Sequence, residues 1–239
     1  MAEKMTEEQI SFIERLNTGT SWTYNEFFEK NGYLVIKNLW DPKELYRPFP
    51  KERGMISYWG NKLDQFNYTE VEDQVEGSLS TYWHPQYRSI HSGIRSKLEE
   101  KLGRKLCNTY YYDRFYFPGQ ALKKHIDRDA CEISVTIHVS SNLKDPWPIW
   151  IKTPDTYSDK KRTFVEETGK DVSVILNAGD GMIYKGCERP HWREPMSSEY
   201  QKTWYGKKVK RENLYYHQVF FHYVLIDGQR SHYANDSVR

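Results

Sequence analysis

Apolar positions between residues 85 and 103 recur at helical spacing. Isoleucine and leucine stand at every fourth position from Ile90 to Leu102, after Pro85 and before Gly103. This spacing predicts an amphipathic helix over Gln86–Leu102 that begins near the proline and ends at the glycine. We expect its apolar stripe to pack on a core.

Shorter signals precede this helix. Capping-box patterns begin at Thr6 and at Thr23, and each predicts the start of a helix. Gly32 predicts the end of the second helix, and the β-rich run Tyr33–Ile36 follows it directly. Asp41, followed by proline, predicts the N-cap of a further helix.

After Lys105 the apolar pattern changes to short β-rich runs separated by turn residues. Such spacing predicts about eight strands in a sandwich, barrel or jelly roll. We place them at residues 109–117, 121–126, 131–140, 147–152, 172–176, 181–185, 191–194 and 215–226. Residues 154–171 and 195–213 are expected to be long loops. Residues 54–83 are expected to mix loop and short strands on a substrate-facing surface.

These elements predict one α+β domain over residues 1–239. Within it we expect mainly helical support over 1–105, a β core over 106–227 and a tail over 228–239.

Composition narrows the choice of partners. The net charge is only +2, and the basic run Lys207–Arg211 is interpreted as a solvated loop. We therefore expect neither a nucleic-acid nor a membrane partner. Three widely spaced cysteines and a charged N-terminus favour a soluble cytoplasmic protein with reduced thiols. The oligomeric state is left open.

One short motif carries metal chemistry. His125 and Asp127 are two residues apart, so on a strand their side chains point to the same face. With a third ligand from a distant strand, they make two histidines and one carboxylate on one side of a metal. That ligand set is typical of non-haem Fe(II) oxygenases, which keep the opposite positions open.

The residues around this motif strengthen the interpretation. Tyr116-Phe-Pro-Gly-Gln lies upstream of His125, and Gly179-Asp-Gly-Met-Ile-Tyr184 leads into a distal histidine, His191. The combination resembles the prolyl-4-hydroxylase-like branch of the 2-oxoglutarate/Fe(II) oxygenases, from about Tyr110 to Val224. The resemblance implies a double-stranded β-helix, also called a jelly roll or cupin-like fold, with N-terminal supporting helices.

The resemblance also implies a site. His125, Asp127 and His191 would bind Fe(II), with 2-oxoglutarate and O2 as cosubstrates and no catalytic residue beyond these ligands. Because Asp127 is present, hydroxylation is favoured over halogenation. Arg193 is our choice to bind the far carboxylate of 2-oxoglutarate, since a guanidinium grips a carboxylate with two parallel hydrogen bonds. Lys202 and Arg211 are the reserves.

Other side chains receive weaker roles. Tyr116 is either a hydrogen-bond donor to 2-oxoglutarate or a buried aromatic, and Thr136 is expected to line the cosubstrate site. Arg128 and Trp192 are expected to support the ligands or to face the substrate. The remaining histidines are expected to be structural or exposed: His138 is packed, at most one of His217 and His222 points inward, and His84, His91 and His232 lie on the surface.

The expected activity is hydroxylation of a C–H bond, on a prolyl or other side chain of a peptide or protein. Hydroxylation of an amino acid or another small molecule is the nearest alternative. A cupin-type β-helix that binds a ligand without redox chemistry is a second alternative, since fold does not fix function. An iron enzyme that does not use 2-oxoglutarate is a third.

Overall fold

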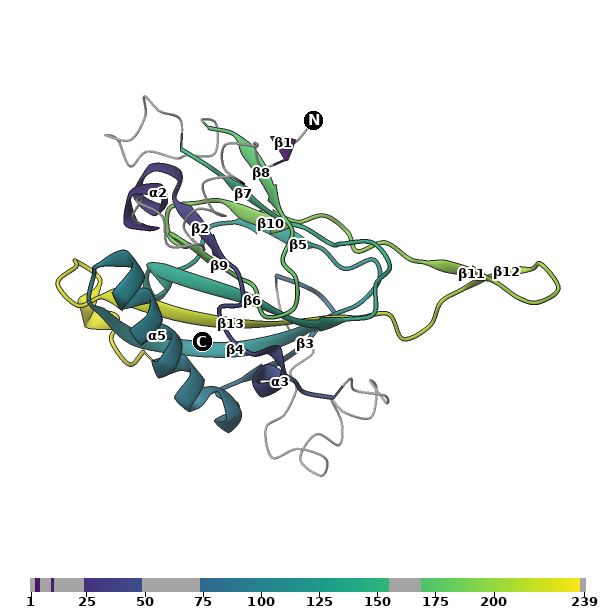
Figure 1. Ribbon diagram of the computed structural model, residues 1–239, viewed down its shortest axis with the longest axis horizontal. Coiled ribbons are helices and arrows are strands. Elements are labelled where there is room, and N and C mark those ends of the chain that lie inside the picture. Colours follow the sequence, from purple (N-terminus) through teal and green to yellow (C-terminus); the bar gives the residue numbers. More distant parts are fainter. Residues whose placement is uncertain (1–2, 5–9, 11–23, 49–73, 155–168, 237–239) are drawn as a thin grey trace.

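Two β-sheets packed face to face make up most of the computed structural model, which describes residues 3–4, 10, 24–48, 74–154 and 169–236 (Figure 1). The helix predicted from Thr6 and the loop at 155–168 fall largely or wholly outside these residues, as does most of the irregular stretch at 54–83.

The larger sheet has six strands. In spatial order they are β2 (Tyr33–Ile36), β9 (Gly181–Tyr184), β6 (Ile133–Ser141), β13 (Tyr216–Leu225), β4 (Leu106–Tyr116) and β3 (Leu79–Tyr82). All neighbours are antiparallel. The edge strands β2 and β3 both come from the first 105 residues.

The smaller sheet has five strands. In spatial order they are β1 (Glu3–Lys4), β8 (Asp171–Val174), β7 (Ile149–Lys152), β10 (His191–Arg193) and β5 (Leu122–His125). Each of the eight strands predicted after Lys105 is therefore present, with ends that differ by a few residues. The predicted α+β class is confirmed.

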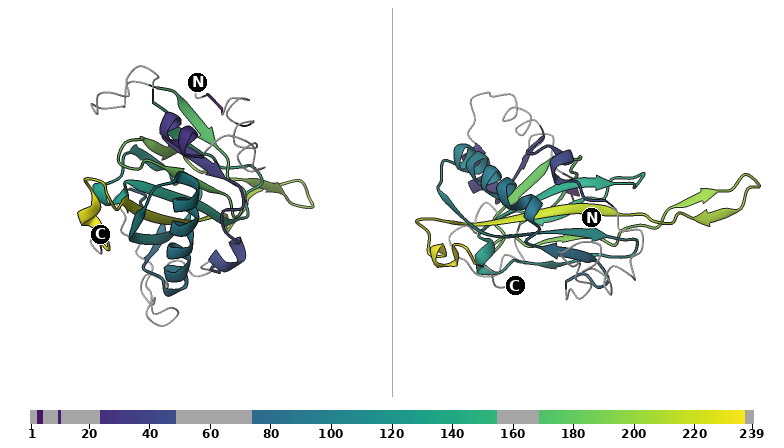
Figure 2. Two further views of the ribbon diagram at one scale, coloured as in Figure 1. Left: turned by 60° about the vertical axis from the view of Figure 1, so that its left-hand side comes forward. Right: turned by 90° about the horizontal axis from the view of Figure 1, so that it is seen from below.

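The helices lie on the outer face of the larger sheet (Figure 2). They are α2 (Tyr24–Asn31), α3 (Pro42–Leu45) and α5 (Arg88–Leu102). The chain also forms three short 3-10 turns, η1 (Pro85–Tyr87), η2 (Asp129–Cys131) and η3 (Ser231–Tyr233). Gly32 and Gly103 end α2 and α5 with φ of 73° and 62°, as predicted. The Asp41 side chain accepts a hydrogen bond from the amide of Lys43 and caps α3.

Strand β6 separates the core from the site. Val135 and Ile137 join the apolar cluster that contains the buried stripe of α5, whereas Ser134 and Thr136 point into the space between the sheets. Burying each aliphatic side chain of this cluster stabilises the fold by about 1.5–3 kcal/mol. The face of β6 toward the helices therefore carries aliphatic packing, and its face toward the smaller sheet carries polar side chains.

His91 is buried, although we predicted a surface position. It lies on α5 beside the apolar stripe, and its ring packs against Tyr111, Phe221 and Tyr223. Its Nε2 atom is 3.0 Å from the carbonyl oxygen of His222. The prediction was wrong because the buried face of a helix is wider than the single row of residues that repeats every four positions.

The segment 195–213 is not the loop that we predicted. It contains β11 (Tyr200–Lys202) and β12 (Lys208–Lys210), which pair as an antiparallel hairpin projecting from the body (Figure 1). Thr203 and Gly206 close the turn, with Gly206 at φ 86°. Neither face of this ribbon is buried, so the strands lack the apolar alternation that identifies a strand in sequence.

Among the described residues, no helix combines the length and the apolar character needed to cross a bilayer.

Candidate metal centre

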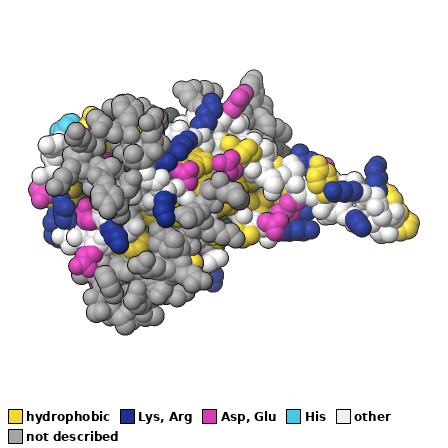
Figure 3. Space-filling model, turned by 90° about the horizontal axis from the view of Figure 1, so that it is seen from above, with side chains coloured by type: hydrophobic (Ala, Val, Ile, Leu, Met, Phe, Trp, Pro, Cys, Tyr) yellow, Lys and Arg dark blue, Asp and Glu magenta, His cyan; other side chains and the backbone are white. Residues whose placement is uncertain are grey.

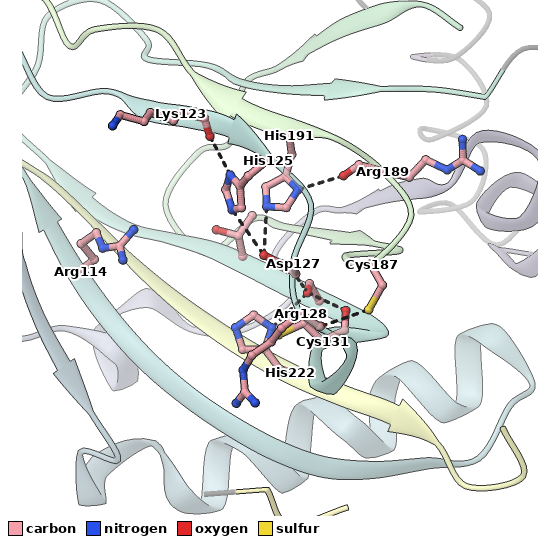
Figure 4. Close-up of polar contacts among 12 residues, drawn as sticks. Arg114, Lys123, His125, Asp127, Arg128, Cys131, Cys187, Arg189, His191 and His222 are labelled. Atoms are coloured by element: carbon pink, nitrogen blue, oxygen red, sulfur yellow. Dashed lines mark hydrogen bonds and ion pairs between the residues drawn. The ribbon is translucent and has the colours of Figure 1, made fainter. Parts of the chain in front are cut away.

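Three predicted ligands meet between the two sheets. Strands β5 and β10 are antiparallel neighbours, and His125 lies directly opposite His191 in their register. Asp127 follows β5, and its Oδ1 atom lies 3.5 Å from Nε2 of His125 and 3.4 Å from Nε2 of His191. Figure 4 shows both imidazoles directed at this carboxylate. Their donor atoms all lie within 4.8 Å of one another, a spacing that suits one metal ion.

Both imidazole rings are held by backbone carbonyl groups. Nδ1 of His125 is 2.7 Å from the carbonyl oxygen of Lys123, and Nδ1 of His191 is 3.0 Å from that of Arg189. In each pair the Nδ1–H group donates, which leaves the lone pair on Nε2 facing Asp127. A carbonyl group that accepts from Nδ1–H keeps the proton on Nδ1, so that Nε2 is free to bind a metal.

The electrostatics favour an ionised carboxylate. Burial alone would raise the pKa of Asp127, but His191 and His125 outweigh it and hold the pKa well below its usual range. Burial would likewise lower the pKa of His191, but Asp127 outweighs it and the pKa is raised. The carboxylate is therefore charged at neutral pH, as a metal ligand must be.

A polar pair fixes the other oxygen of this carboxylate. The Ser134 hydroxyl donates to Oδ2 of Asp127 at 2.8 Å and lies 3.0 Å from Nδ1 of His222. His222 thus points inward, whereas His217 lies on the opposite face of β13 and bonds Asp113. The expectation that at most one of these histidines points inward is confirmed.

A second group of donor atoms, from Asp127, Cys131 and His222, is also close enough to hold a metal. Burial and the charge of Asp127 raise the pKa of the Cys131 thiol well above its usual value. Because the thiolate is the form that ligates metals, the set of two histidines and one carboxylate is the better site.

Arg193 is a buried cation whose hydrogen-bond partners among the described residues are neutral. Its guanidinium donates to the carbonyl oxygen of Trp147 at 2.5 Å, to Oε1 of Gln218 at 2.8 Å and to the Tyr216 hydroxyl at 3.3 Å. It packs on the rings of Trp147 and Tyr216. No acidic side chain among the described residues pairs with it, and its Nε atom is buried without a hydrogen bond. A buried positive charge without a negatively charged partner destabilises the fold, and an anion bound beside it would compensate the charge.

Thr136 and Tyr116 lie in the same interior. The Gln218 amide donates to the Thr136 hydroxyl, which links Thr136 to Arg193 through Gln218. The Tyr116 hydroxyl accepts a hydrogen bond from Arg114 at 3.3 Å, and its ring contacts Trp147. Both positions agree with the roles predicted for these residues, which stay predictions.

Sequence reasoning missed two interior residues, Gln218 and Arg114. Gln218 is in phase with Phe220 and His222 along β13, and this alternation could have identified it. Arg114 is fully buried, donates to Ser80 and lies over the rings of Tyr112 and Tyr116. It is in phase with Tyr116 on β4, two residues away.

The predicted position of Trp192 near the ligands needs correction. Trp192 stacks on Trp150 and lies under Lys124 on the outer face of the smaller sheet, because alternation along β10 turns it away from His191 and Arg193. Trp192 therefore faces away from the metal ligands. Arg128 pairs with Asp236 at 2.5 Å and packs on the Tyr110 ring, and its predicted role stays a prediction.

The reserve anchors, Lys202 and Arg211, both lie on the hairpin segment. Lys202 is exposed on β11, and Arg211 pairs with Glu199. Neither approaches the interior, so Arg193 is the predicted anchor that the structure places between the sheets.

No family model matches the sequence, and no curated protein is matched by sequence similarity. Solved structures nevertheless share the fold. A Trichoplax adhaerens prolyl hydroxylase in complex with a hypoxia-inducible-factor peptide is 13% identical over 98% of both chains, with a TM-score of 0.55. A Pseudomonas putida prolyl-4-hydroxylase is 14% identical over 83% of this chain and 96% of its own, with a TM-score of 0.52.

The similarity extends to an epimerase. The non-haem α-ketoglutarate-dependent epimerase SnoN from nogalamycin biosynthesis is 11% identical over 90% of this chain and 83% of its own, with a TM-score of 0.57. The fold is therefore a double-stranded β-helix, which the chain shares with these enzymes. The predicted double-stranded β-helix is confirmed, and prolyl hydroxylases are among the proteins that share it.

Proposed function

We propose that the chain is a non-haem Fe(II), 2-oxoglutarate-dependent dioxygenase that hydroxylates a C–H bond. The observation that carries this proposal is the convergence of His125, Asp127 and His191 from separate parts of a double-stranded β-helix. Two imidazoles and one ionised carboxylate on one side of a metal are the ligand set of this enzyme class.

The donor set fits a ferrous ion. His125 and His191 present Nε2 lone pairs, and Asp127 presents Oδ1 while Ser134 holds Oδ2. All three ligands come from one side, so the facing positions are left for the cosubstrates. When bound, iron, 2-oxoglutarate and O2 supply the oxidising chemistry, and the chain supplies binding and orientation.

Arg193 fits the far carboxylate of 2-oxoglutarate. The guanidinium is buried, and its hydrogen-bond partners among the described residues are neutral. Its Nε–H has no acceptor among these residues. A bound dicarboxylate would supply the missing negative charge and acceptor oxygens. Gln218 and Tyr216 hold the guanidinium in place through its Nη2 atom.

The proposed substrate is a side chain of a peptide or protein, a prolyl residue first of all. The Trichoplax adhaerens structure, with the same fold over nearly the whole chain, is described with a peptide bound. A small molecule is the second candidate, because SnoN is described in complex with iron, α-ketoglutarate and nogalamycin RO. Ring-rich interior side chains such as Tyr112, Trp147 and Phe220 would exclude water around either substrate.

Anaerobic titration of the apo-protein with Fe(II) and then 2-oxoglutarate tests the proposal. A weak visible charge-transfer band of the chelate is the expected result. His191→Ala should lose the band, and the exposed His232→Ala variant should keep it. An intact wild-type protein that binds iron but gives no band would reject 2-oxoglutarate use, and one that binds no iron would favour the cupin-type binding protein.

Succinate release then identifies the substrate class. Proline-containing peptides, free amino acids and other small molecules are offered in parallel under O2. Peptide-dependent succinate supports the first candidate, and succinate stimulated by small molecules alone supports the second. Asp127→Ala should abolish turnover, and unchanged activity would remove Asp127 from the ligand set.

A further inference from the structure

The hairpin carries a concentration of positive charge that the whole-chain total conceals. Lys202, Lys207, Lys208 and Lys210 fall between Tyr200 and Lys210, and this stretch contains no acidic residue. None of these four lysines forms an ion pair with a described residue. The chain's net charge is +2, so without the four lysines it would be −2. The hairpin therefore carries a local excess of positive charge.

The lysines on the strands are gathered on one face. In the register of β11 and β12, Lys202 lies opposite Lys208 and Tyr200 lies opposite Lys210. These four side chains share a face, and Gln201 and Val209 occupy the other. Like charges directly opposite each other destabilise a ribbon. The Lys202–Lys208 pair thus carries a cost that a bound anion would relieve.

Aromatic rings accompany this basic face. Nζ of Lys208 lies 4.7 Å from the centre of the Tyr200 ring. At the tip, Trp204 is 96% exposed and Tyr205 is 61% exposed, with their rings edge to face. Figure 3 shows the projecting hairpin with basic side chains along it and hydrophobic ones at its end.

The hairpin lies away from the metal ligands. It connects the end of β10, at Arg193, to the start of β13, at Tyr216, whereas His191 is at the opposite end of β10. Figure 1 shows it extending outward from that end of the body. A macromolecule held on the hairpin would leave the metal centre free.

We propose that the hairpin β11–β12 binds single-stranded nucleic acid, with the lysine face on the phosphates and Trp204, Tyr205 and Tyr200 stacking on bases. Lysines interleaved with exposed rings are the arrangement that proteins use for unpaired strands, whose bases are free to stack. A bilayer anchor needs a larger contiguous apolar surface than two rings beside Thr203 and Gly206. This proposal departs from the expectation of no nucleic-acid partner and does not depend on the oxygenase assignment.

Fluorescence anisotropy with labelled oligothymidylate of about 20 nucleotides, a length that exceeds the site size of one module, tests the proposal. The full chain should bind in a salt-dependent manner. Trp204→Ala should weaken binding about tenfold through lost stacking. Lys202→Gln/Lys208→Gln should weaken binding and make the plot of log K against log salt less steep by about 1.4.

Matched variants and a second ligand make the test decisive. Lys30→Gln/Lys43→Gln removes two exposed lysines from the body and should leave binding unchanged. Unchanged thermal unfolding midpoints would show that the hairpin variants are folded. The proposal is overturned if the wild type does not bind at low salt, or if the control variant loses as much affinity. It is also overturned if Trp204→Ala abolishes binding to phosphatidylserine vesicles but leaves oligonucleotide binding intact.

Discussion

Gly186 and Asp127 are in direct contact. The Asp127 amide donates to the Gly186 carbonyl oxygen at 2.8 Å, and a Cβ atom on Gly186 would lie 2.5 Å from Oδ2 of Asp127. The same Cβ would lie 2.4 Å from the Ser134 hydroxyl oxygen. The segments that follow β9 and β5 are thus brought together at a point where only glycine leaves room for the Asp127 carboxylate.

Gly186→Ala should therefore damage the metal centre. The added methyl group would also lie 2.4 Å from the Cys131 carbonyl oxygen, so Asp127, Ser134 and this backbone must shift. Loss of such supporting geometry typically lowers metal affinity about 10- to 100-fold. Anaerobic Fe(II) titration measures the loss. Gly228→Ala is the control, because its Cβ would press on Leu225, with Cβ atoms 2.9 Å apart, and on no ligand. Equal iron affinity in Gly186→Ala and wild type would contradict the prediction.

Arg193→Gln should weaken binding of 2-oxoglutarate. Removing one partner of a buried, hydrogen-bonded charge pair costs several kcal/mol, so we expect KM for 2-oxoglutarate to rise about 100-fold. Iron affinity should change little, since Arg193 is not a ligand. Steady-state succinate formation as a function of 2-oxoglutarate concentration gives the value.

Arg47→Gln is the matched control. Arg47 is as deeply buried as Arg193, but it is paired with Asp113 on the outer face of β4. Its loss should lower stability and leave KM unchanged. A similar KM in Arg193→Gln and wild type would exclude Arg193 as the anchor.

The sequence predicted the strands well because each is a short β-rich run bounded by turn residues. Alternation along β6 and β13 then separates their two faces. One face packs on apolar residues and the other lines the interior, so the pattern records the fold. The same alternation assigns Arg193 to the interior and Trp192 to the exterior. The role predicted for Trp192 could thus have been rejected from sequence.

The hairpin could not be predicted in this way. Both of its faces meet solvent, so no apolar pattern marks Tyr200–Lys202 or Lys208–Lys210 as strands. Its insertion between β10 and β13 also places the positions about ten residues past His191, such as Lys202, outside the body. Counting residues from His191 along the sequence therefore could not identify the side chain that would bind the far carboxylate of 2-oxoglutarate.

Asp113→Asn should destabilise the fold strongly. Arg47 donates to both carboxylate oxygens of Asp113 at 2.9 Å, and His217 lies 2.9 Å from Oδ2. Burial alone would raise the pKa of Asp113, but Arg47 and His217 outweigh it and the pKa is lowered. Breaking a buried pair of this kind costs about 3–5 kcal/mol, because the remaining charge is left without compensation.

Urea unfolding of the apo-protein measures this cost. Asp129→Asn is the control, since Asp129 pairs with Arg230 at the surface, and such pairs contribute about 0–1 kcal/mol. If both variants lose the same small amount of stability, the prediction that the buried Arg47–Asp113 pair stabilises the fold strongly is wrong.

Acid should destabilise the chain through its buried neutral histidines, of which His138 is the clearest case. Its ring stacks on Tyr216, and its Nδ1–H donates to the Leu176 carbonyl oxygen at 2.9 Å, while Nε2 is buried without a partner. Burial lowers the pKa of His138 to about 4, although the hydrogen bond to Leu176 opposes this shift. Burial likewise lowers the pKa of His91 to about 3.

The direction of this pH effect depends on whether the folded or the unfolded chain takes up the proton more readily. Below about pH 6.5 the unfolded chain protonates His138, whereas the folded chain does so only near pH 4. The free energy of unfolding should therefore fall by about 1.4 kcal/mol per pH unit for this residue as the pH drops from about 6.5 to 4.

His138→Gln keeps a donor for Leu176 and removes the titration, so its stability should decline less steeply by that amount. Urea unfolding at several pH values measures the slope, and the exposed His232→Gln variant should match the wild type. A slope that is the same in His138→Gln and wild type would mean that His138 takes up its proton equally in both states, contrary to its burial against Tyr216.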